Sequence, residues 1–199
     1  FFIKGEFLCL ECINNEYPDN LSLAQAYLQQ YERFDNHSYY LDSAHFFLKK
    51  LDLISYEGIY VHIYYLFLRQ EYNLIVKKIQ KIGVDNLLSN FLINKDYNNK
   101  DAWTCYRIGE SFNKTNMLDT AINFYQQAVK LAPYNLEFRN KYANCLFKQN
   151  KVSFAIDEFN FILNEDDNFI SAYVNLGYIY FTKGNLKRAL EYYNYALQL

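Results

Sequence analysis

The chain repeats the same residue types every 34 positions from residue 102 onward. Small residues return at two positions of this period in three successive copies, namely Gly109, Ala143 and Gly177, and Ala121, Ala155 and Ala189. Large apolar residues keep the same spacing at Ile108, Tyr142 and Leu176. A fixed period of this length is the mark of a repeat architecture, so it constrains the fold more than any single motif does.

Each period carries the pattern of a helical hairpin. Apolar residues such as Leu176 and Tyr180 recur at helical spacing in the first half, and the polar turn at 183–185 separates them from a second helical pattern. The small residues let the two helices approach closely. One hairpin cannot bury its whole apolar face, whereas stacked hairpins can, so the pattern predicts an all-α solenoid.

The third copy resembles the tetratricopeptide repeat, whose period is also 34 residues. The resemblance is carried by Tyr173-Val174-Asn175-Leu176-Gly177-Tyr178-Ile179-Tyr180, followed by Ala189, Tyr193 and Ala196. Pro133 ends the first copy at a position where this family favours proline. The resemblance implies a right-handed α-solenoid of antiparallel helical hairpins, a TPR-like superhelix.

We therefore predict three regular motifs, at 102–135, 136–169 and 170–199. Residues 1–101 are predicted to be degenerate helical repeats of the same kind, so that 1–101 and 102–199 form one continuous solenoid. The polar stretch 94–101 is predicted to be a loop between the irregular and the regular half.

Helical periodicity before residue 102 predicts a series of helices, at 2–13, 21–34, 36–51, 56–70, 73–82 and 85–93. Asp19 or Asn20 is suited to cap the second of these helices. The turn at 71–73 resembles the turn within a repeat, but Tyr65 and Lys77 stand where small residues are expected around it. The pairing of these helices is therefore left open.

Composition and motifs argue against several classes of function. The net charge of −2 gives no basic footprint for nucleic acid, and no apolar run reaches the ~20 residues that span a bilayer. Cys9 and Cys12 form a CxxC without a second ligand pair, and the three histidines lack metal-ligand spacing. No phosphate-binding glycine motif is present. We predict no catalytic, cofactor-binding or metal site, and hence no enzyme.

The location of the protein in the cell is not fixed by the sequence. Four scattered cysteines favour a reducing compartment such as the cytoplasm. The sequence lacks a starting Met and stops abruptly at Leu199, which suggests a fragment from which targeting signals are missing.

The surface that remains is the concave face, which the first helices of successive hairpins line. The family register places mostly aromatic, amide and carboxylate side chains there, Glu137 among them, together with Ser171 and Val174. The predicted partner-binding residues are Trp103, Tyr106, Glu110, Asn113, Asn140, Asn144, Phe147, Tyr178 and Phe181. Such a mixture is typical of peptide-binding surfaces.

Two functions follow from these observations. The first is a non-catalytic scaffold that binds a segment of another protein along this face. The alternative is an accessory segment of a larger enzyme or assembly whose chemistry lies elsewhere. Some proteins of this family hold the C-terminal carboxylates of chaperones in a clamp of Lys and Asn side chains. The equivalent positions here are Tyr106, Glu110, Lys141, Ser171 and Asn175. Because Lys141 supplies the only positive charge there and Glu110 would repel a carboxylate, we predict no such clamp.

Overall fold

The computed structural model describes residues 19–33, 38–49, 56–87 and 99–199. Across these ranges the regular secondary structure is α-helix and no strand occurs, which confirms the predicted all-α class. The chain divides into two compact units, Phe1–Glu71 and Tyr72–Leu199. All three predicted motifs fall within the second unit. The continuity of one solenoid through both units stays a prediction.

The first unit contains α2 (Asn20–Arg33), α3 (Ser38–Leu48) and α4 (Tyr56–Leu68). Helix α2 packs along α3, and α4 contacts both. Leu28 and Ala44 are fully buried between them. Asp19 caps α2, as predicted, because its Oδ1 accepts from the backbone N–H groups of Leu21 at 2.9 Å and Ser22 at 2.8 Å. The predicted helix at 2–13 lies outside the described residues.

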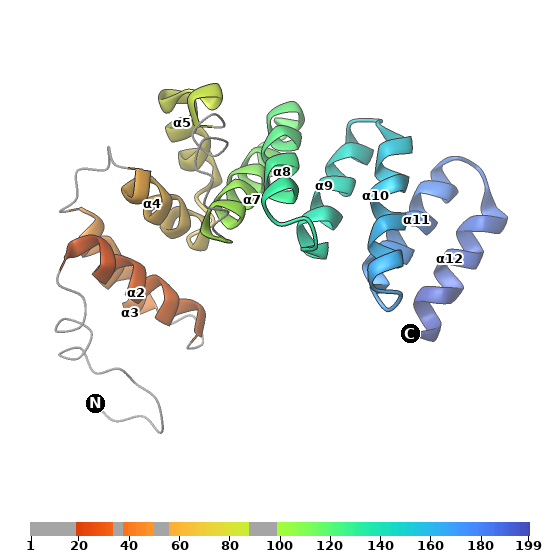
Figure 1. Cartoon of the computed structure of the whole chain (residues 1–199), viewed down its shortest axis with the longest axis horizontal. Helices are drawn as coiled ribbons and strands as arrows, with labels where there is room; N and C mark the ends of the chain where they lie inside the picture. Colours follow the sequence, from red (N-terminus) through yellow and green to blue (C-terminus); the bar gives the residue numbers. More distant parts are fainter. Residues whose placement is uncertain (1–18, 34–37, 50–55, 88–98) are drawn as a thin grey trace, which may run out of the picture. The chain divides into compact units, whose positions relative to one another are not determined.

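The second unit is a row of helices in which neighbours in sequence are neighbours in space (Figure 1). Their bounds are α5 (Tyr72–Ile82), α7 (Asn99–Lys114), α8 (Leu118–Leu131), α9 (Leu136–Lys148), α10 (Val152–Glu165), α11 (Ile170–Thr182) and α12 (Leu186–Gln198). The pairs α7–α8, α9–α10 and α11–α12 are the three hairpins, joined through contacts of α8 with α9 and of α10 with α11. Helix α5 packs on α7.

Helix α7 begins earlier than the sequence suggested. The stretch 94–101 was expected to be a loop, yet the helix starts at Asn99 and places Asp101 in its first turn. A carboxylate in this position interacts favourably with the positive end of the helix dipole. Residues 99–101 of the predicted loop therefore belong to the helix.

The small residues of the repeat lie at helix–helix contacts, as predicted. All four alanines are buried, at Ala121, Ala143, Ala155 and Ala189. A Cβ atom built on Gly109 would lie 3.0 Å from Cδ1 of Tyr125, and one on Gly177 would lie 2.7 Å from Cε1 of Tyr193. In both hairpins, the aromatic ring of the second helix therefore rests directly on the glycine of the first.

The turns within the hairpins share one backbone geometry. Each has a residue with positive φ in the same register, at Asn116 (62°), Asn150 (61°) and Gly184 (75°). The next residue donates its N–H to the carbonyl five positions earlier, in the pairs Met117–Phe112, Lys151–Leu146 and Asn185–Tyr180. Asparagine and glycine are the residues that adopt this left-handed conformation most readily.

The same turn occurs once more between α4 and α5. Gln70 has φ of 58°, and the N–H of Glu71 donates to the carbonyl of Leu66 at 2.9 Å. When Gln70 is aligned with Asn116, the positions equivalent to Gly109 and Ala121 lie two residues before Tyr65 and Lys77, which the sequence analysis placed there. The positions that correspond to the small residues are then Ile63 and Ile75, and each is fully buried. Large apolar residues thus replace small ones at this turn.

Candidate partner-binding surface

The nine predicted residues lie on α7, α9 and α11, the first helices of the three hairpins. Their exposure differs strongly from one helix to the next. Tyr106 and Glu110 on α7 are each 7 % exposed, whereas Tyr178 and Phe181 on α11 are 51 % and 55 % exposed. The predicted face is therefore composed of a buried part and an open part.

On α7 the aromatic residues pack against the next hairpin. The ring of Tyr106 stacks on Phe138 with centroids 4.9 Å apart, and its hydroxyl donates to Oε1 of Glu137 at 3.2 Å. The indole of Trp103 meets Phe138 edge-on at 4.8 Å. These contacts join α7 to α9. Phe138, which the sequence analysis did not single out, is the residue on which both rings converge.

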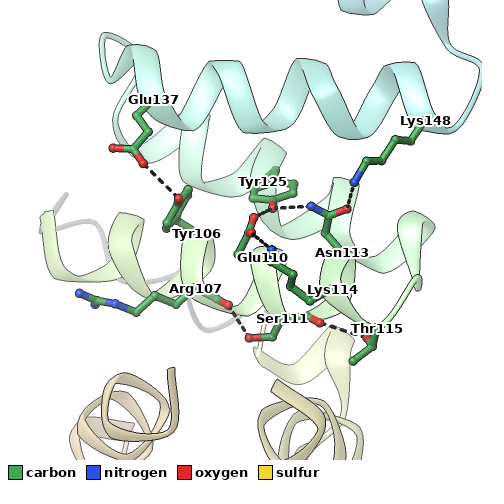
Figure 2. A network of polar contacts seen from close by, with 10 residues as sticks. All are labelled: Tyr106, Arg107, Glu110, Ser111, Asn113, Lys114, Thr115, Tyr125, Glu137 and Lys148. Carbon is green, nitrogen blue, oxygen red and sulfur yellow. Dashed lines mark hydrogen bonds and ion pairs between the residues drawn. The ribbon is translucent and has the colours of Figure 1, made fainter. Parts of the chain in front are cut away.

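A polar network lies beside Tyr106 (Figure 2). The hydroxyl of Tyr125 donates to Oε2 of Glu110 at 2.5 Å, and Nδ2 of Asn113 donates to the same hydroxyl at 3.4 Å. Nζ of Lys148 on α9 donates to Oδ1 of Asn113 at 3.0 Å. Nζ of Lys114 lies 3.8 Å from Oε1 of Glu110. The network connects both helices of the first hairpin to the second.

Burial keeps the phenols of this network protonated. Desolvation raises the pKa of Tyr125 well above its ordinary value, and the neighbouring Glu110 carboxylate raises it further. Burial also raises the pKa of Tyr106, with Glu137 as the next cause. Both hydroxyls are therefore hydrogen-bond donors at neutral pH. Glu110 accepts from Tyr125 inside the protein, so its carboxylate is already engaged.

The open part of the surface lies on α9 and α11. Asn140, Asn144 and Phe147 are half-buried, and Phe147 meets the ring of Tyr178 edge-on at 5.7 Å. Oδ1 of Asn140 accepts from Nδ2 of Asn175 at 3.1 Å and from Nδ2 of Asn144 at 3.4 Å. Amides on α9 are thus placed next to aromatic rings on α11.

The exposed apolar residues of α11 form a longer stripe than the sequence analysis named. Ile170 is 46 % exposed and Val174 is 43 % exposed, and both precede Tyr178 and Phe181 on one side of the helix. The spacing of four, four and three residues is the signal that could have identified Ile170. The exposed apolar stripe therefore runs along the whole of α11.

Other chemistry is not assembled in the parts of the chain that the structure describes. No group of three His, Cys, Asp or Glu side chains there could hold a metal ion, and no helix there combines the length and the hydropathy of a membrane span. Cys105 and Cys145 are free thiols that are buried. The CxxC at Cys9 and Cys12 lies outside the described residues.

Comparison with known proteins gives matches to repeat proteins. Models of the tetratricopeptide repeat match residues 104–135 and 170–199. No curated protein sequence matches the chain. A solved structure titled "MamA 41-end from Desulfovibrio magneticus RS-1" is similar with a TM-score of 0.67 and 16% identity, over 91% of this chain and 95% of that one.

A second solved structure is similar over most of both chains. It is titled "Crystal structure of YrrB: a TPR protein with an unusual peptide-binding site" and has a TM-score of 0.65. The identity is 18%, over 96% of this chain and 91% of the other. At this identity the likeness concerns the fold, which is the solenoid of helical hairpins predicted from the 34-residue period.

Proposed function

The chain carries tetratricopeptide repeats, and on that premise we propose that it is a non-catalytic scaffold which binds a segment of a partner protein. The partner segment lies along α9 and α11, on a surface that consists of Asn140, Asn144, Phe147, Tyr178 and Phe181, with Val174 beside them. We call these six residues the open surface. They include five of the nine residues predicted from the sequence.

The observation that supports this proposal most is the exposure of large apolar side chains on α11. Val174, Tyr178 and Phe181 are between 43 % and 55 % exposed and share one side of the helix. Scattered apolar residues on a surface need no explanation, but a contiguous group of them favours an interaction site. Aromatic residues are the usual anchors of such sites because they bury much area with few rotatable bonds.

The amides of α9 give the surface its polar specificity. Each Asn side chain has two N–H donors and an oxygen with two acceptor sites. Two bonds fill the oxygen of Asn140, which leaves the N–H donors of Asn140 and the oxygen of Asn144 for a partner. The remaining groups are suited to the backbone of an extended peptide, while the rings of Phe147 and Tyr178 take its apolar side chains. The fold neighbour whose title mentions a peptide-binding site supports this choice of partner.

The α7 residues have a supporting role in this proposal. Tyr106 and Glu110 are buried in contacts with α8 and α9, so they hold the second hairpin in position. Trp103 and Asn113 are half-buried. Recognition by rings and amides depends little on charge, so the affinity should vary only modestly with salt.

Selection from a phage-displayed peptide library tests the proposal. Peptides selected on the wild type should lose about tenfold or more in affinity for the Tyr178→Ala/Phe181→Ala variant, as expected for aromatic anchors. Tyr195→Ala on α12 is the matched control, because Tyr195 is 56 % exposed but lies outside the open surface. Equal binding of the selected peptides to both variants would contradict the proposed site.

A further inference from the structure

Met117 is the single methionine of the chain, and it stands at the turn between α7 and α8. Its side chain is 37 % exposed, so the thioether is accessible to small oxidants in the solvent. The equivalent residues of the second and third hairpins are Lys151 and Asn185. Of the three hairpin turns, the first therefore carries an oxidisable side chain at this position.

The backbone of Met117 is held by the turn itself. Its N–H donates to the carbonyl of Phe112 at 2.8 Å, and its carbonyl accepts from the N–H of Ala121 at 3.0 Å. Asn116, which precedes it, has the φ of 62° that this turn requires. A chemical change at the sulfur therefore leaves the hydrogen bonds that shape the turn in place.

The sulfur of Met117 is in contact with α5. Nε2 of Gln80 donates to Sδ of Met117 at 3.9 Å, across 37 residues of sequence. Gln80 follows Ile79, which is fully buried, and α5 packs on α7. The contact therefore joins α5 to the turn of the first hairpin. It is a weak bond, because a thioether is a poor acceptor.

The polar groups around this contact favour an oxygen atom on the sulfur. Lys77 lies three residues before Gln80 and is its neighbour on the surface of α5, and Lys81 follows Gln80 directly. Both lysines are exposed. Asp119, the carboxylate nearest to Met117 in sequence, accepts from Nε2 of Gln149. A sulfoxide oxygen, which carries partial negative charge, would thus face an amide donor on a basic helix.

We propose that Met117 is a site of reversible oxidation by peroxides, and that its sulfoxide holds α5 more tightly to the first hairpin. The sulfur attacks one oxygen of hydrogen peroxide and the O–O bond breaks. The attacked oxygen passes its proton to the departing hydroxide, which leaves as water. The sulfur thereby loses the two electrons that the peroxide gains. The new S=O oxygen accepts from Gln80 in place of the weaker sulfur.

Hydrogen exchange tests the proposal on the whole chain. The protein is treated with hydrogen peroxide and then with dithiothreitol, which reduces disulfides but leaves the sulfoxide, and mass spectrometry verifies one added oxygen on Met117. Amide exchange of α5 should then slow about threefold, as expected for one stronger hydrogen bond that opposes local opening. Methionine sulfoxide reductases A and B, one for each epimer of the sulfoxide, should restore the original rate.

Three variants show whether the effect acts through this contact. Gln80→Glu should abolish the slowing, because a carboxylate cannot donate to the sulfoxide oxygen. Gln126→Glu is the matched control and should keep the slowing, since Gln126 is exposed on α8 and lies about 14 Å along that helix from Met117. Met117→Leu should exchange at the same rate before and after peroxide, which accounts for any oxidation of the cysteines.

Four results would overturn the proposal. The first two are unchanged or faster exchange of α5 in the oxidised wild type, and failure of peroxide to oxidise Met117 in the folded chain. The third is equal slowing in Gln80→Glu, since the oxygen would then not act through this contact. The fourth is equal slowing in Met117→Leu, which would assign the effect to the cysteines. None of these measurements depends on binding at the open surface.

Discussion

The first and third hairpins differ at positions that are equivalent in the repeat. The inward positions are Tyr106, Glu110 and Asn113 in the first hairpin and Val174, Tyr178 and Phe181 in the third. Tyr106 and Glu110 are 7 % exposed and Asn113 is half-buried, whereas the three residues of the third hairpin are 43 % to 55 % exposed. The polar residues are thus the covered ones and the apolar residues the open ones.

This reversal favours a structural role for the covered residues and a role in binding for the open ones. The covered Glu110 and Asn113 are hydrogen-bonded to Tyr125, so burial does not leave their polar atoms without partners. The open apolar side chains leave about half of their area exposed to water, which favours a role in binding. The polarity of an inward side chain therefore does not show by itself whether the residue is structural or binds a partner. The residues that cover the side chain must be known as well.

The largest contrast should come from removal of the tyrosine that rests on the glycine. Tyr125 is fully buried, while its equivalent Tyr193 is half-buried. Tyr125→Ala should lower the free energy of unfolding by about 3–5 kcal/mol, the usual range for a buried aromatic. Tyr193→Ala should cost about 1–2 kcal/mol, since less of its area is lost from the core. Urea denaturation followed by circular dichroism measures both, and equal losses would refute the contrast.

Overpacking at the glycines sharpens the comparison. Gly109→Leu and Gly177→Leu should each lower the free energy of unfolding by about 1–3 kcal/mol, because a side chain at either position meets the tyrosine ring. The cost should be larger at Gly109, where Tyr125 is enclosed, than at Gly177, where Tyr193 has room to move. Thermal denaturation gives the two values. An unchanged midpoint for Gly177→Leu would count against the repeat register.

Single hydroxyl groups test the same contrast on a smaller scale. Tyr106→Phe removes the bond to Glu137 and should cost about 0.5–1.5 kcal/mol. Tyr178→Phe, at the equivalent face of the third hairpin, should change the free energy of unfolding by less than about 0.5 kcal/mol. A loss at Tyr178 as large as at Tyr106 would show that the open surface is structural.

The fold of the second unit was predictable because its evidence is local and periodic. The buried Gly109 and Ala121 follow from the 34-residue spacing, and the turns follow from Asn or Gly at the position with positive φ. In the first unit, residue type limited the cap of α2 to Asp19 or Asn20, and Asp19 is the residue that caps it. Each of these features depends on residues that are close together in the sequence.

The exposure of the inward face was not predictable in the same way. Tyr106 is covered by Glu137 and Phe138, more than 30 residues later in the chain, and no single-hairpin pattern contains that contact. The register before residue 102 was left open, because Ile63 and Ile75 stand where the repeat has small residues. Turn geometry at Gln70, which is a backbone property, restores the register.

A last test concerns pH and the buried thiols of the first two hairpins. Burial raises the pKa of Cys145 to about 11 and that of Cys105 well above its ordinary value. The unfolded chain loses these protons near pH ~8.5, while the folded chain retains them. Stability from this source is complete below that pH and is lost as the pH rises toward 11, since the unfolded state then binds fewer protons. The Cys105→Ala/Cys145→Ala variant should therefore lose less stability than the wild type between these values in urea denaturation. Parallel curves for the two proteins would show that the thiols titrate alike in both states, and that the first junction is more open to solvent than its burial indicates.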